Sequence, residues 1–377
     1  MKIFVVSRGL PSEINRILGI FEMDQAKALQ EMGHDIVFLS VDLRSFRRKR
    51  PFGFNSYLRE GIRIEEASIP LGRVPKAALL FFGKWGFRRI FSKAVKKYGR
   101  PDLVHSHFAD VACMVTEGLK GTGISHIITE HSSQLNGQLD EYDMNVYRNA
   151  YETADGIITV SSALQKRLEE LFGVKSRCIH NIVDLDIFTY EERKKKDEFT
   201  FISVGGLTPI KNTANTIKAF AEVASEKEDV KLIIVGDGPE RQNLEQLASE
   251  LSIDGKVEFT GMLTRARIHD YHLGADCFVL PSKSETFGVA YIEAMASGLP
   301  VIASRCGGPE DFVTEENGIL IPENTVDDLA RAMMHMYENH SNYNGKCISE
   351  EVRERFSGRN IAGQIDEFYK SKGVVNE

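Results

Sequence analysis

Two glutamates eight residues apart, Glu285 and Glu293, have a spacing that allows chemistry. They bound the segment 285–293 (ETFGVAYIE), which directly follows the apolar run 277–281 (CFVLP). If a strand ends before this segment and a helix begins inside it, one carboxylate lies at the turn. The other then lies about 12 Å away, two helical turns further on. The alternative is that Glu285 only caps the helix and Glu293 is solvated, as isolated glutamates usually are.

A helix that begins inside this segment predicts a diphosphate site. The backbone N–H groups of Phe287, Gly288 and Val289 would lie at its N-terminus, where donors lack partners and anions bind. Gly288 lets a ligand approach the backbone closely. A second loop, 204–212 (VGGLTPIKN), combines glycines with Lys211 after an apolar run, which suits a phosphate group. This loop lacks the P-loop pattern and is weak evidence on its own.

Histidines end two further apolar runs. His131 follows the run 124–129 (ISHIIT), and His105 and His107 lie in 102–107 (DLVHSH). The carboxyl end of a parallel strand is where such sheets bind ligands, so these side chains are candidates for catalysis. The alternative is an ordinary loop histidine. No HExxH or Cys/His spacing supports a metal site here.

Asp184 and Asp186 have the spacing of a DxD metal–diphosphate motif. They lie close to Asn181, between an apolar run and a charged segment. Aspartate and asparagine cluster in this way for turn chemistry, which is the interpretation we favour.

Strands and helices alternate around all of these residues, which predicts an α/β fold of doubly wound parallel sheets with helices on both faces. A run of eight charged residues, 191–198 (EERKKKDE), separates two such series and indicates a linker. The expected strands of the first series are 2–7, 35–41, 102–106, 124–129, 156–160 and 177–183. Those of the second are 199–204, 230–235, 256–260, 277–281, 300–304 and 318–321.

The net charge of −7 conceals a basic region. Residues 43–100 hold 16 lysines and arginines against three glutamates, a net charge of +13. Aromatic residues are interleaved at roughly helical spacing, which indicates either a membrane-surface face or a solvated basic face over a buried stripe. We expect the acceptor or membrane face to include Arg88, Arg89, Lys93, Lys96 and Lys97; a second cluster is Arg44, Arg47, Arg48, Lys49 and Arg50.

Composition and cysteine usage place the chain in the cytoplasm. The five cysteines form no CxxC pair, which argues against a disulfide framework. The apolar start is cut off by Arg8, and no run of about 18 apolar residues exists, so we expect neither a secretory signal nor a spanning helix. We expect a cytoplasmic protein, peripheral on the inner face of the membrane, with no nucleic-acid partner.

Taken in their order along the chain, the motifs resemble those of the retaining glycosyltransferases of family 4. These enzymes have the GT-B fold, in which two Rossmann-like domains face a central cleft. The block 285–293 carries the most specific similarity, and Gly19, the run 101–107 (PDLVHSH), His131 and the run 181–188 (NIVDLDIF) add to it. The resemblance implies three parts: an acceptor-binding domain at 1–188, a donor-binding domain at 189–355, and a helix at 356–377 that crosses back to the first domain.

The resemblance also implies a reaction: a hexosyl transfer, with retained anomeric configuration, from a UDP-sugar to an acceptor hydroxyl. The implied acceptor is a polyprenyl-linked glycan of bacterial surface-polysaccharide synthesis. His131 and Glu285 would be catalytic; Glu285 would bind donor-sugar hydroxyls, and His131 would contact the sugar or position the acceptor. Glu293 would accept hydrogen bonds from the ribose. The remaining implied donor-binding residues are Gly19, Gly206, Lys211, Phe287, Gly288 and Val289.

The resemblance implies no cofactor and no metal ion, because amides and Lys211 would stabilise the departing diphosphate. One departure is that the family often has arginine where Gly206 stands. A rival is a sugar-nucleotide epimerase or an NAD-dependent dehydrogenase, with Asp42 binding a ribose. Residues 7–19 lack the GxGxxG turn that this rival needs. A third possibility, a non-catalytic nucleotide-sugar binder, is disfavoured by the intact Glu285, Glu293, Lys211 and His131.

Overall fold

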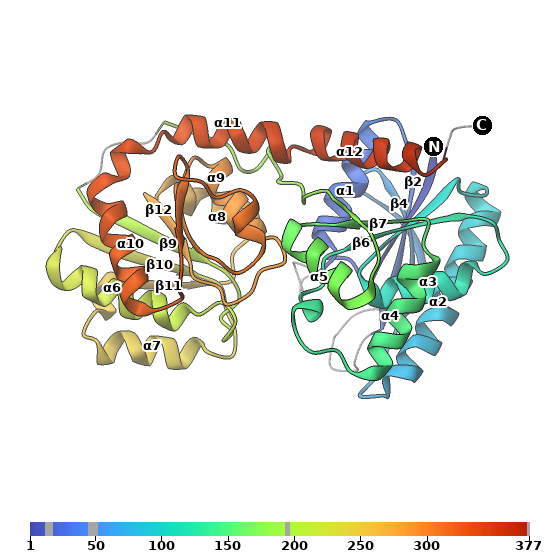
Figure 1. Cartoon of the computed structure of the whole chain (residues 1–377), viewed down its shortest axis with the longest axis horizontal. Coiled ribbons are helices and arrows are strands. Elements are labelled where there is room, and N and C mark those ends of the chain that lie inside the picture. The colour runs from blue at the N-terminus through green and yellow to red at the C-terminus, as the bar shows by residue number, and fades with distance from the viewer. Residues whose placement is uncertain (12–17, 44–51, 193–196, 375–377) are drawn as a thin grey trace. The chain divides into compact units, whose positions relative to one another are not determined.

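A computed structural model describes residues 1–11, 18–43, 52–192 and 197–374. The chain forms two compact units, each built on one sheet (Figure 1). Unit 1 contains Met1–Ile182 and Gly358–Glu377, and unit 2 contains Val183–Ser357. The divisions therefore follow residues 182 and 357, where the sequence placed them after 188 and 355. Each unit is described by itself.

Among the described residues, the sheet of unit 1 has eight strands in the order β3-β4-β2-β1-β5-β6-β7-β8. All neighbouring pairs are parallel except β3 and β4. The order from β4 to β7 is that of a doubly wound fold, with its switch point between β1 and β5. The strands are β1 (Lys2–Ser7), β2 (Asp35–Leu43), β3 (Gly53–Arg59), β4 (Ile62–Ile69), β5 (Leu103–His107), β6 (Ser125–Glu130), β7 (Gly156–Thr159) and β8 (Arg177–Cys178).

Helices cover both faces of this sheet. Successive strand residues point to opposite faces, so Ile3 and Val5 join one apolar core while Phe4 and Val6 join another. Figure 1 shows α1 and α12 on one side of the sheet and α2 and α3 on the other. The helices are α1 (Ile20–Glu31), α2 (Lys76–Tyr98), α3 (Ala109–Leu119), α4 (Glu141–Thr153), α5 (Ser162–Phe172) and α12 (Gly358–Ser371), with a 3-10 helix η1 (Ser133–Asn136).

The antiparallel edge strand β3 departs from the purely parallel sheet that the sequence predicts. β3 and β4 form a hairpin whose two-residue turn is Glu60 and Gly61, with φ angles of 50° and 80°. Turns with two positive φ angles match the twist of paired strands and favour glycine at the second position. The glycine signal is in the sequence, but the basic residues of 43–100 hide the alternation around it.

Unit 2 repeats the doubly wound arrangement. Its described strands form one parallel sheet in the order β11-β10-β9-β12-β13-β14, with the switch point between β9 and β12. The strands are β9 (Phe199–Val204), β10 (Val230–Val235), β11 (Val257–Gly261), β12 (Cys277–Leu280), β13 (Val301–Ser304) and β14 (Gly318–Ile321). The helices are α6 (Thr213–Glu226), α7 (Arg241–Glu250), α8 (Arg265–Leu273), α9 (Val289–Ala296), α10 (Val326–Asn339) and α11 (Gly345–Phe356), with 3-10 helices η2 (Asp254–Lys256), η3 (Gly308–Asp311) and η4 (His340–Asn342).

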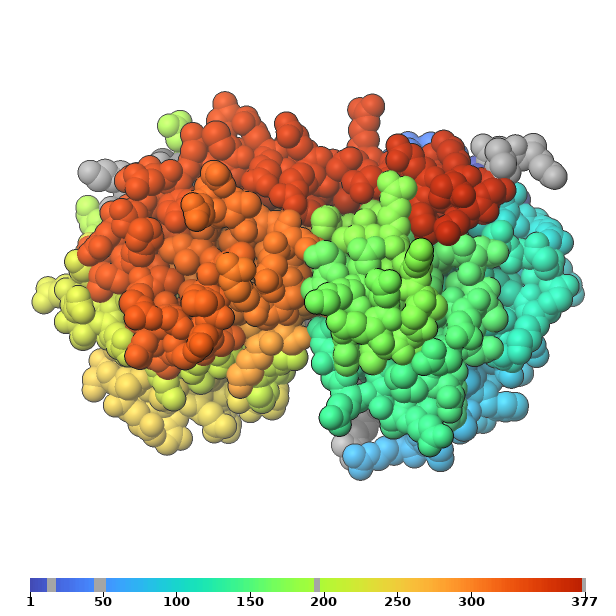
Figure 2. Space-filling model, in the orientation of Figure 1, coloured from blue at the N-terminus to red at the C-terminus, as the bar shows by residue number. Residues whose placement is uncertain are grey.

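The C-terminal helix α12 packs on unit 1. Its buried residues recur at helical spacing, and Ile361, Ile365 and Tyr369 belong to the same apolar core as α1. Figure 2 shows its atoms, in dark red, against the atoms of unit 1. The predicted strand 177–183 is only the two-residue β8, because the chain leaves the sheet after Cys178.

Candidate active site

The predicted donor residues Lys211 and Glu285 meet at the switch point of unit 2. Lys211 lies in the loop after β9, Glu285 in the loop after β12, and Lys211 Nζ is 2.5 Å from Glu285 Oε1. The hydroxyl of Ser282 donates to the same carboxylate oxygen at 2.7 Å. The Glu285 side chain is 10% exposed and that of Lys211 25% exposed, so the pair is partly shielded from water but still accessible to a ligand.

Backbone hydrogen bonds hold Glu285 in place. Its N–H donates to the carbonyl of Cys306 at 3.1 Å, and its carbonyl accepts from the N–H of Gly308 at 3.1 Å. A Cβ on Gly308 would lie 2.2 Å from the carbonyl oxygen of Phe287, so only glycine fits there. The segment after β13 therefore holds the backbone from which the Glu285 side chain reaches Lys211.

Helix α9 begins within the predicted motif, at Val289, directly after Gly288. Gly288 has φ 99°, a conformation that favours glycine. The first amides of a helix lack intrahelical partners, so this turn offers backbone donors. The ring of Phe287 is buried against Phe312 and Phe356, which leaves only its backbone for any ligand.

Glu293 is 8% exposed, on α9, and has a cationic partner. Arg265 Nε, from the start of α8, is 3.3 Å from Glu293 Oε1, and Arg265 Nη1 is 3.9 Å from Asp184 Oδ2. The alternative of a solvated Glu293 is therefore wrong. Arg265 is not predicted by the sequence, because nothing in its local pattern separates it from the nearby exposed Arg267.

Gly206 is exposed, and a Cβ built on it would meet nothing within 4 Å. Two glycines of the next loop, Gly236 and Gly238, are the ones that have no room for a side chain. A Cβ on Gly236 would lie 1.9 Å from the carbonyl oxygen of Gly205, and one on Gly238 would lie 2.3 Å from that of Leu207. The loops after β9 and β10 therefore pack backbone against backbone, and Gly206 itself faces open space.

In unit 1, His131 lies directly after β6 and is 9% exposed. Burial and the nearby charge of Arg8 lower the pKa of His131 to about 3, so its imidazole is neutral near pH 7. Glu130 holds this turn: its Oε1 accepts from the N–H groups of His131 at 2.9 Å and Ser132 at 2.6 Å. Its Oε2 accepts from the Tyr151 hydroxyl at 2.5 Å, and burial raises the pKa of the Glu130 carboxyl.

The two other predicted histidines lie beside His131. His107 Nδ1 is 3.0 Å from His131 Nε2, and the His105 and His107 rings stack with centroids 4.7 Å apart. His105 Nδ1 is 2.6 Å from the Tyr369 hydroxyl of α12, and its Nε2 is 2.7 Å from Thr129 Oγ1. Burial lowers the pKa of His105 to about 3 and that of His107 well below its usual value. All three imidazoles are therefore neutral near pH 7.

Gly19 precedes α1 with φ 76°. A Cβ there would lie 2.2 Å from the carbonyl oxygen of Gly9, so contact between two loop backbones already requires the glycine. The predicted approach of this backbone to a phosphate is a separate role, and it stays a prediction.

The predicted acceptor or membrane face lies on α2. Its buried side packs on the sheet through residues such as Gly86, Phe87 and Ile90. The outward side is aromatic in its first half, where Phe81, Phe82 and Trp85 are 61%, 37% and 47% exposed. It is basic in its second half, where the five predicted cations are all exposed: Arg88, Arg89, Lys93, Lys96 and Lys97. The cluster Arg44 to Arg50 lies outside the described residues.

Four of the five cations have a structural partner, and for two of them, Lys93 and Lys97, it is a carboxylate. Arg88 Nη2 donates to the Glu117 carbonyl at 2.8 Å, and the Arg89 guanidinium lies 4.7 Å from the centroid of the Phe54 ring. Glu65 of β4 is fully buried, and its carboxylate lies 3.1 Å from Lys93 Nζ and 3.4 Å from Lys97 Nζ. Burial raises the pKa of this carboxyl, but hydrogen bonds from Ser56, Lys93 and Tyr98 outweigh that effect and leave the pKa lowered. Lys93 and Lys97 therefore balance a buried charge.

The acidic pair Asp184 and Asp186 forms a turn. Asp184 Oδ1 accepts from the N–H of Asp186 at 3.2 Å, and the Asp184 carbonyl accepts from the N–H of Phe188.

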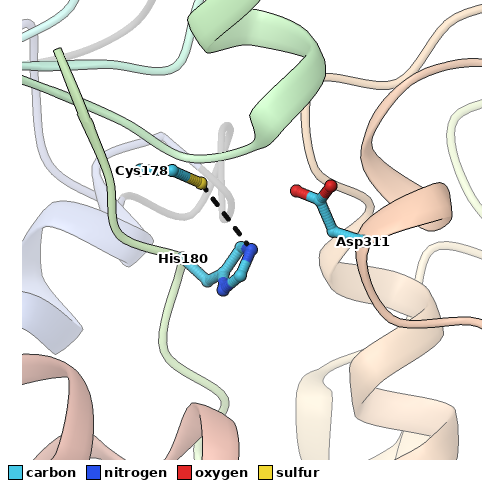
Figure 3. A group of neighbouring side chains, drawn as sticks. All are labelled: Cys178, His180 and Asp311. Carbon is cyan, nitrogen blue, oxygen red and sulfur yellow. Dashed lines mark hydrogen bonds between the residues drawn. The ribbon is translucent and has the colours of Figure 1, made fainter.

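Figure 3 draws three side chains that could be considered as metal ligands: Cys178, His180 and Asp311. Cys178 Sγ is 3.8 Å from His180 Nε2 in unit 1, whereas Asp311 belongs to unit 2. One cysteine and one histidine are too few ligands for a structural zinc ion.

Two doubly wound units with these motifs define the chain as a GT-B glycosyltransferase. It belongs to the glycosyltransferases of group 1 and family 4: residues 187–372 match the family model for glycosyl transferases group 1, and residues 21–187 match that for Glycosyltransferase Family 4. Together the two models span both units.

Curated relatives extend this match over nearly the whole chain. The putative teichuronic acid biosynthesis glycosyltransferase TuaC of Bacillus subtilis (strain 168) is 28% identical over 97% of this chain and 96% of its own. An uncharacterized glycosyltransferase of Haemophilus influenzae is 30% identical over 89% of this chain and 90% of its own. The alpha-monoglucosyldiacylglycerol synthase of Streptococcus pneumoniae is 28% identical over 81% and 75%.

Solved structures agree with the fold. Sucrose-phosphate synthase from Thermosynechococcus elongatus aligns with a TM-score of 0.81 and 23% identity over 98% of this chain and 99% of its own. Anabaena Alr3699/HepE, in complex with UDP and glucose, aligns with a TM-score of 0.75 and 20% identity over 98% and 100%. At these identities the likeness shows the fold alone.

Proposed function

We propose that this glycosyltransferase moves a hexosyl group, with retention, from a UDP-sugar to an acceptor hydroxyl of a lipid-linked glycan. The observation that carries the proposal is the Lys211–Glu285 pair at the switch point of unit 2, with Glu293 on the helix that follows. Ligands of doubly wound sheets bind at this point. Neither the family models nor the relatives give support to the epimerase or dehydrogenase alternative.

The donor would be held by groups of complementary charge. Lys211 and the first amides of α9 would bind the diphosphate, and Glu293 would accept hydrogen bonds from ribose hydroxyls. Lys211 is bound to Glu285 before any ligand arrives, so the diphosphate would compete for or share this cation. The choice of uridine is supported by the UDP complex of Alr3699/HepE, which has the same fold.

In the proposed reaction the bond between the anomeric carbon and the diphosphate oxygen breaks, and a bond to the acceptor oxygen forms on the same face. The acceptor proton passes to the departing phosphate. Lys211 stabilises the negative charge that grows on that phosphate, and Glu285 binds a donor-sugar hydroxyl. His131 positions the acceptor as a neutral hydrogen-bonding group, because burial lowers the pKa of its imidazole to about 3.

We further propose that no metal ion takes part. The chemistry assigned to a metal, stabilisation of the diphosphate, is already covered by Lys211 and backbone amides. Asp184, the acidic candidate nearest in pattern to a DxD motif, is engaged by its own turn and by Arg265.

A thermal-shift panel of UDP, GDP, ADP and NAD tests the donor and the metal together. UDP is expected to raise the unfolding temperature more than the others, and equally in EDTA and in Mn²⁺ or Mg²⁺. At 100 times its Kd, a ligand adds about 2.7 kcal/mol of stability. A larger shift with NAD would contradict the proposal, and a UDP shift that disappears in EDTA would restore Asp184 and Asp186 as metal ligands.

For the acceptor we propose that the outward side of α2 docks on an anionic membrane surface. Its aromatic half suits the headgroup boundary and its basic half suits anionic lipid. Within the described residues no helix combines the length and hydrophobicity needed to cross a bilayer. The names of two relatives, a teichuronic acid glycosyltransferase and a monoglucosyldiacylglycerol synthase, support a polymer or lipid acceptor at such a surface.

Vesicle co-sedimentation tests the docking face. Wild type is expected to bind anionic vesicles at low salt and to lose binding at high salt. Replacing Arg88, Arg89 and Lys96 by serine should weaken binding roughly 100-fold, since each cation contributes about 1 kcal/mol. Lys93 and Lys97 are left intact, because their loss would leave Glu65 buried without a cation.

The matched control replaces three exposed cations of unit 2, Lys218, Arg267 and Arg331, by serine. This control should bind vesicles as wild type does. Equal binding by both triple variants, or negligible binding of wild type to anionic and neutral vesicles alike, would contradict the docking face and favour a water-soluble acceptor.

A further inference from the structure

We infer that His107 is a positioning residue whose hydrogen bond ties the tautomer of the His131 imidazole to its own. The inference rests on the proposed function only in that His131 acts in the reaction. It rests on the structure for the contact itself: His107 Nδ1 and His131 Nε2 are 3.0 Å apart, with His107 fully buried.

Because both imidazoles are neutral, the hydrogen bond between them can have either of two directions. Each neutral imidazole carries one N–H, so a hydrogen bond between the two rings needs the proton on one ring and a lone pair on the other. If His107 donates, His131 carries its proton on Nδ1; if His131 donates, its Nδ1 is an acceptor. The direction of this one bond therefore decides whether His131 Nδ1 offers a ligand a proton or a lone pair.

His107 is itself fixed from two directions. Its ring stacks on His105, whose two nitrogens are both engaged, by Tyr369 and by Thr129. The next residue, Phe108, has φ 71° and ψ 146°, a strained conformation for a residue with a side chain. Its N–H donates to the Thr129 carbonyl at 2.9 Å, so backbone pairing holds the strain in place. His107 therefore has little freedom to leave His131.

Each ring of the pair has a second nitrogen, which does not take part in the contact between His107 and His131 and is a candidate to bind a ligand. His131 Nδ1 and His107 Nε2 are buried, and neither makes a hydrogen bond of good geometry with the residues that the structure describes. The side chain of Asn181 is close enough to His131 to raise the pKa of its imidazole slightly, against the larger effect of burial. Buried polar atoms without partners are costly, so these two nitrogens are candidates to bind a ligand or an ordered water molecule. On His131 that atom is the one whose polarity His107 determines.

Two variants separate the hydrogen bond from the packing. His107→Phe keeps an aromatic ring to stack on His105 but removes Nδ1, whereas His107→Asn keeps a hydrogen-bonding group close to the position of Nδ1. His126→Phe is the matched control: it is a buried histidine of β6 that bonds to Ser106. Thermal unfolding of all three variants checks that they fold.

The readout is the tautomer of His131, measured by nitrogen-15 NMR of the full chain, together with kcat. Wild type, His107→Asn and the control are expected to show one tautomer, and His107→Phe a mixture. His107→Phe should also lose about tenfold in kcat at unchanged donor KM, the worth of one hydrogen bond, and His107→Asn should recover most of it.

A single, unchanged tautomer in folded His107→Phe would overturn the inference, as would equal loss of kcat in the Phe and Asn variants. A different result bears on the proposed function: full activity of His131→Ala would remove His131 from the reaction. That outcome is distinguishable, because the tautomer spectra do not depend on activity.

Discussion

Replacing Lys211 by methionine is expected to lower the turnover of the UDP-sugar by about 100- to 1,000-fold, the range for removing one group that stabilises a developing oxyanion. Lys211 is the only predicted donor residue with a positive charge, and it lies at the switch point of unit 2. Methionine keeps the length of the side chain and removes the ammonium group. The measurement is the initial rate of UDP release from the UDP-sugar that the thermal-shift panel supports.

Two comparisons separate chemistry from folding in this experiment. Lys211→Met removes the cation beside the Glu285 carboxylate and leaves it, among the described residues, the hydrogen bond from Ser282. The double variant with Glu285→Gln removes that unpaired charge, and its unfolding temperature, compared with that of Lys211→Met, shows how much the charge destabilises the fold. Lys218→Met, an exposed lysine of α6, is the control and should keep the wild-type rate. A loss below threefold in folded Lys211→Met would exclude the assigned role of Lys211.

Replacing Glu293 by alanine is expected to weaken UDP binding by about 10- to 100-fold, because a hydrogen bond to a charged group contributes about 1.5–3 kcal/mol. Glu293 is 8% exposed, on α9, and its carboxylate is already oriented by Arg265 at 3.3 Å. A carboxylate held in this way can accept from ribose hydroxyls without losing side-chain freedom on binding. Isothermal titration calorimetry gives the dissociation constants.

A ligand without the ribose hydroxyls completes the Glu293 test. Wild type should bind 2′,3′-dideoxy-UDP as weakly as Glu293→Ala binds UDP, and the variant should not distinguish the two ligands. If the variant still prefers UDP by the wild-type factor, Glu293 does not contact the ribose. Glu293→Ala also leaves Arg265 without this carboxylate, so the unfolding temperature must be measured beside the affinity.

Most strands of both sheets follow from local sequence. Short apolar runs of strand length alternate with helical patterns, which is enough to predict parallel sheets with helices on both faces. The start of α9 was also predicted from neighbouring residues: Gly288 adopts φ 99°, and the helix begins at the next residue. The hairpin of β3 and β4 was missed although Gly61 signals its turn, since basic residues obscure the alternation in that region.

The charge state and partners of the site residues were decided by tertiary structure. Lys211 and Glu285 are 74 positions apart, and they meet because strand order brings the ends of β9 and β12 together. Helix packing has a similar effect. It brings Arg265 of α8 to Glu293 of α9, and it brings Lys93 and Lys97 of α2, which the sequence presents as free cations, to the buried Glu65 of β4.

By itself, the sequence determined the α/β class, the family and the candidate residues for donor binding, because these depend on patterns within about ten neighbouring positions. The tertiary structure alone decided that His131 is neutral and bonded to His107, and that Gly206 faces open space. The physical reason is that burial, pairing and free volume are set by residues that are distant in the chain, and only the order of the strands and the packing of the helices bring such residues together.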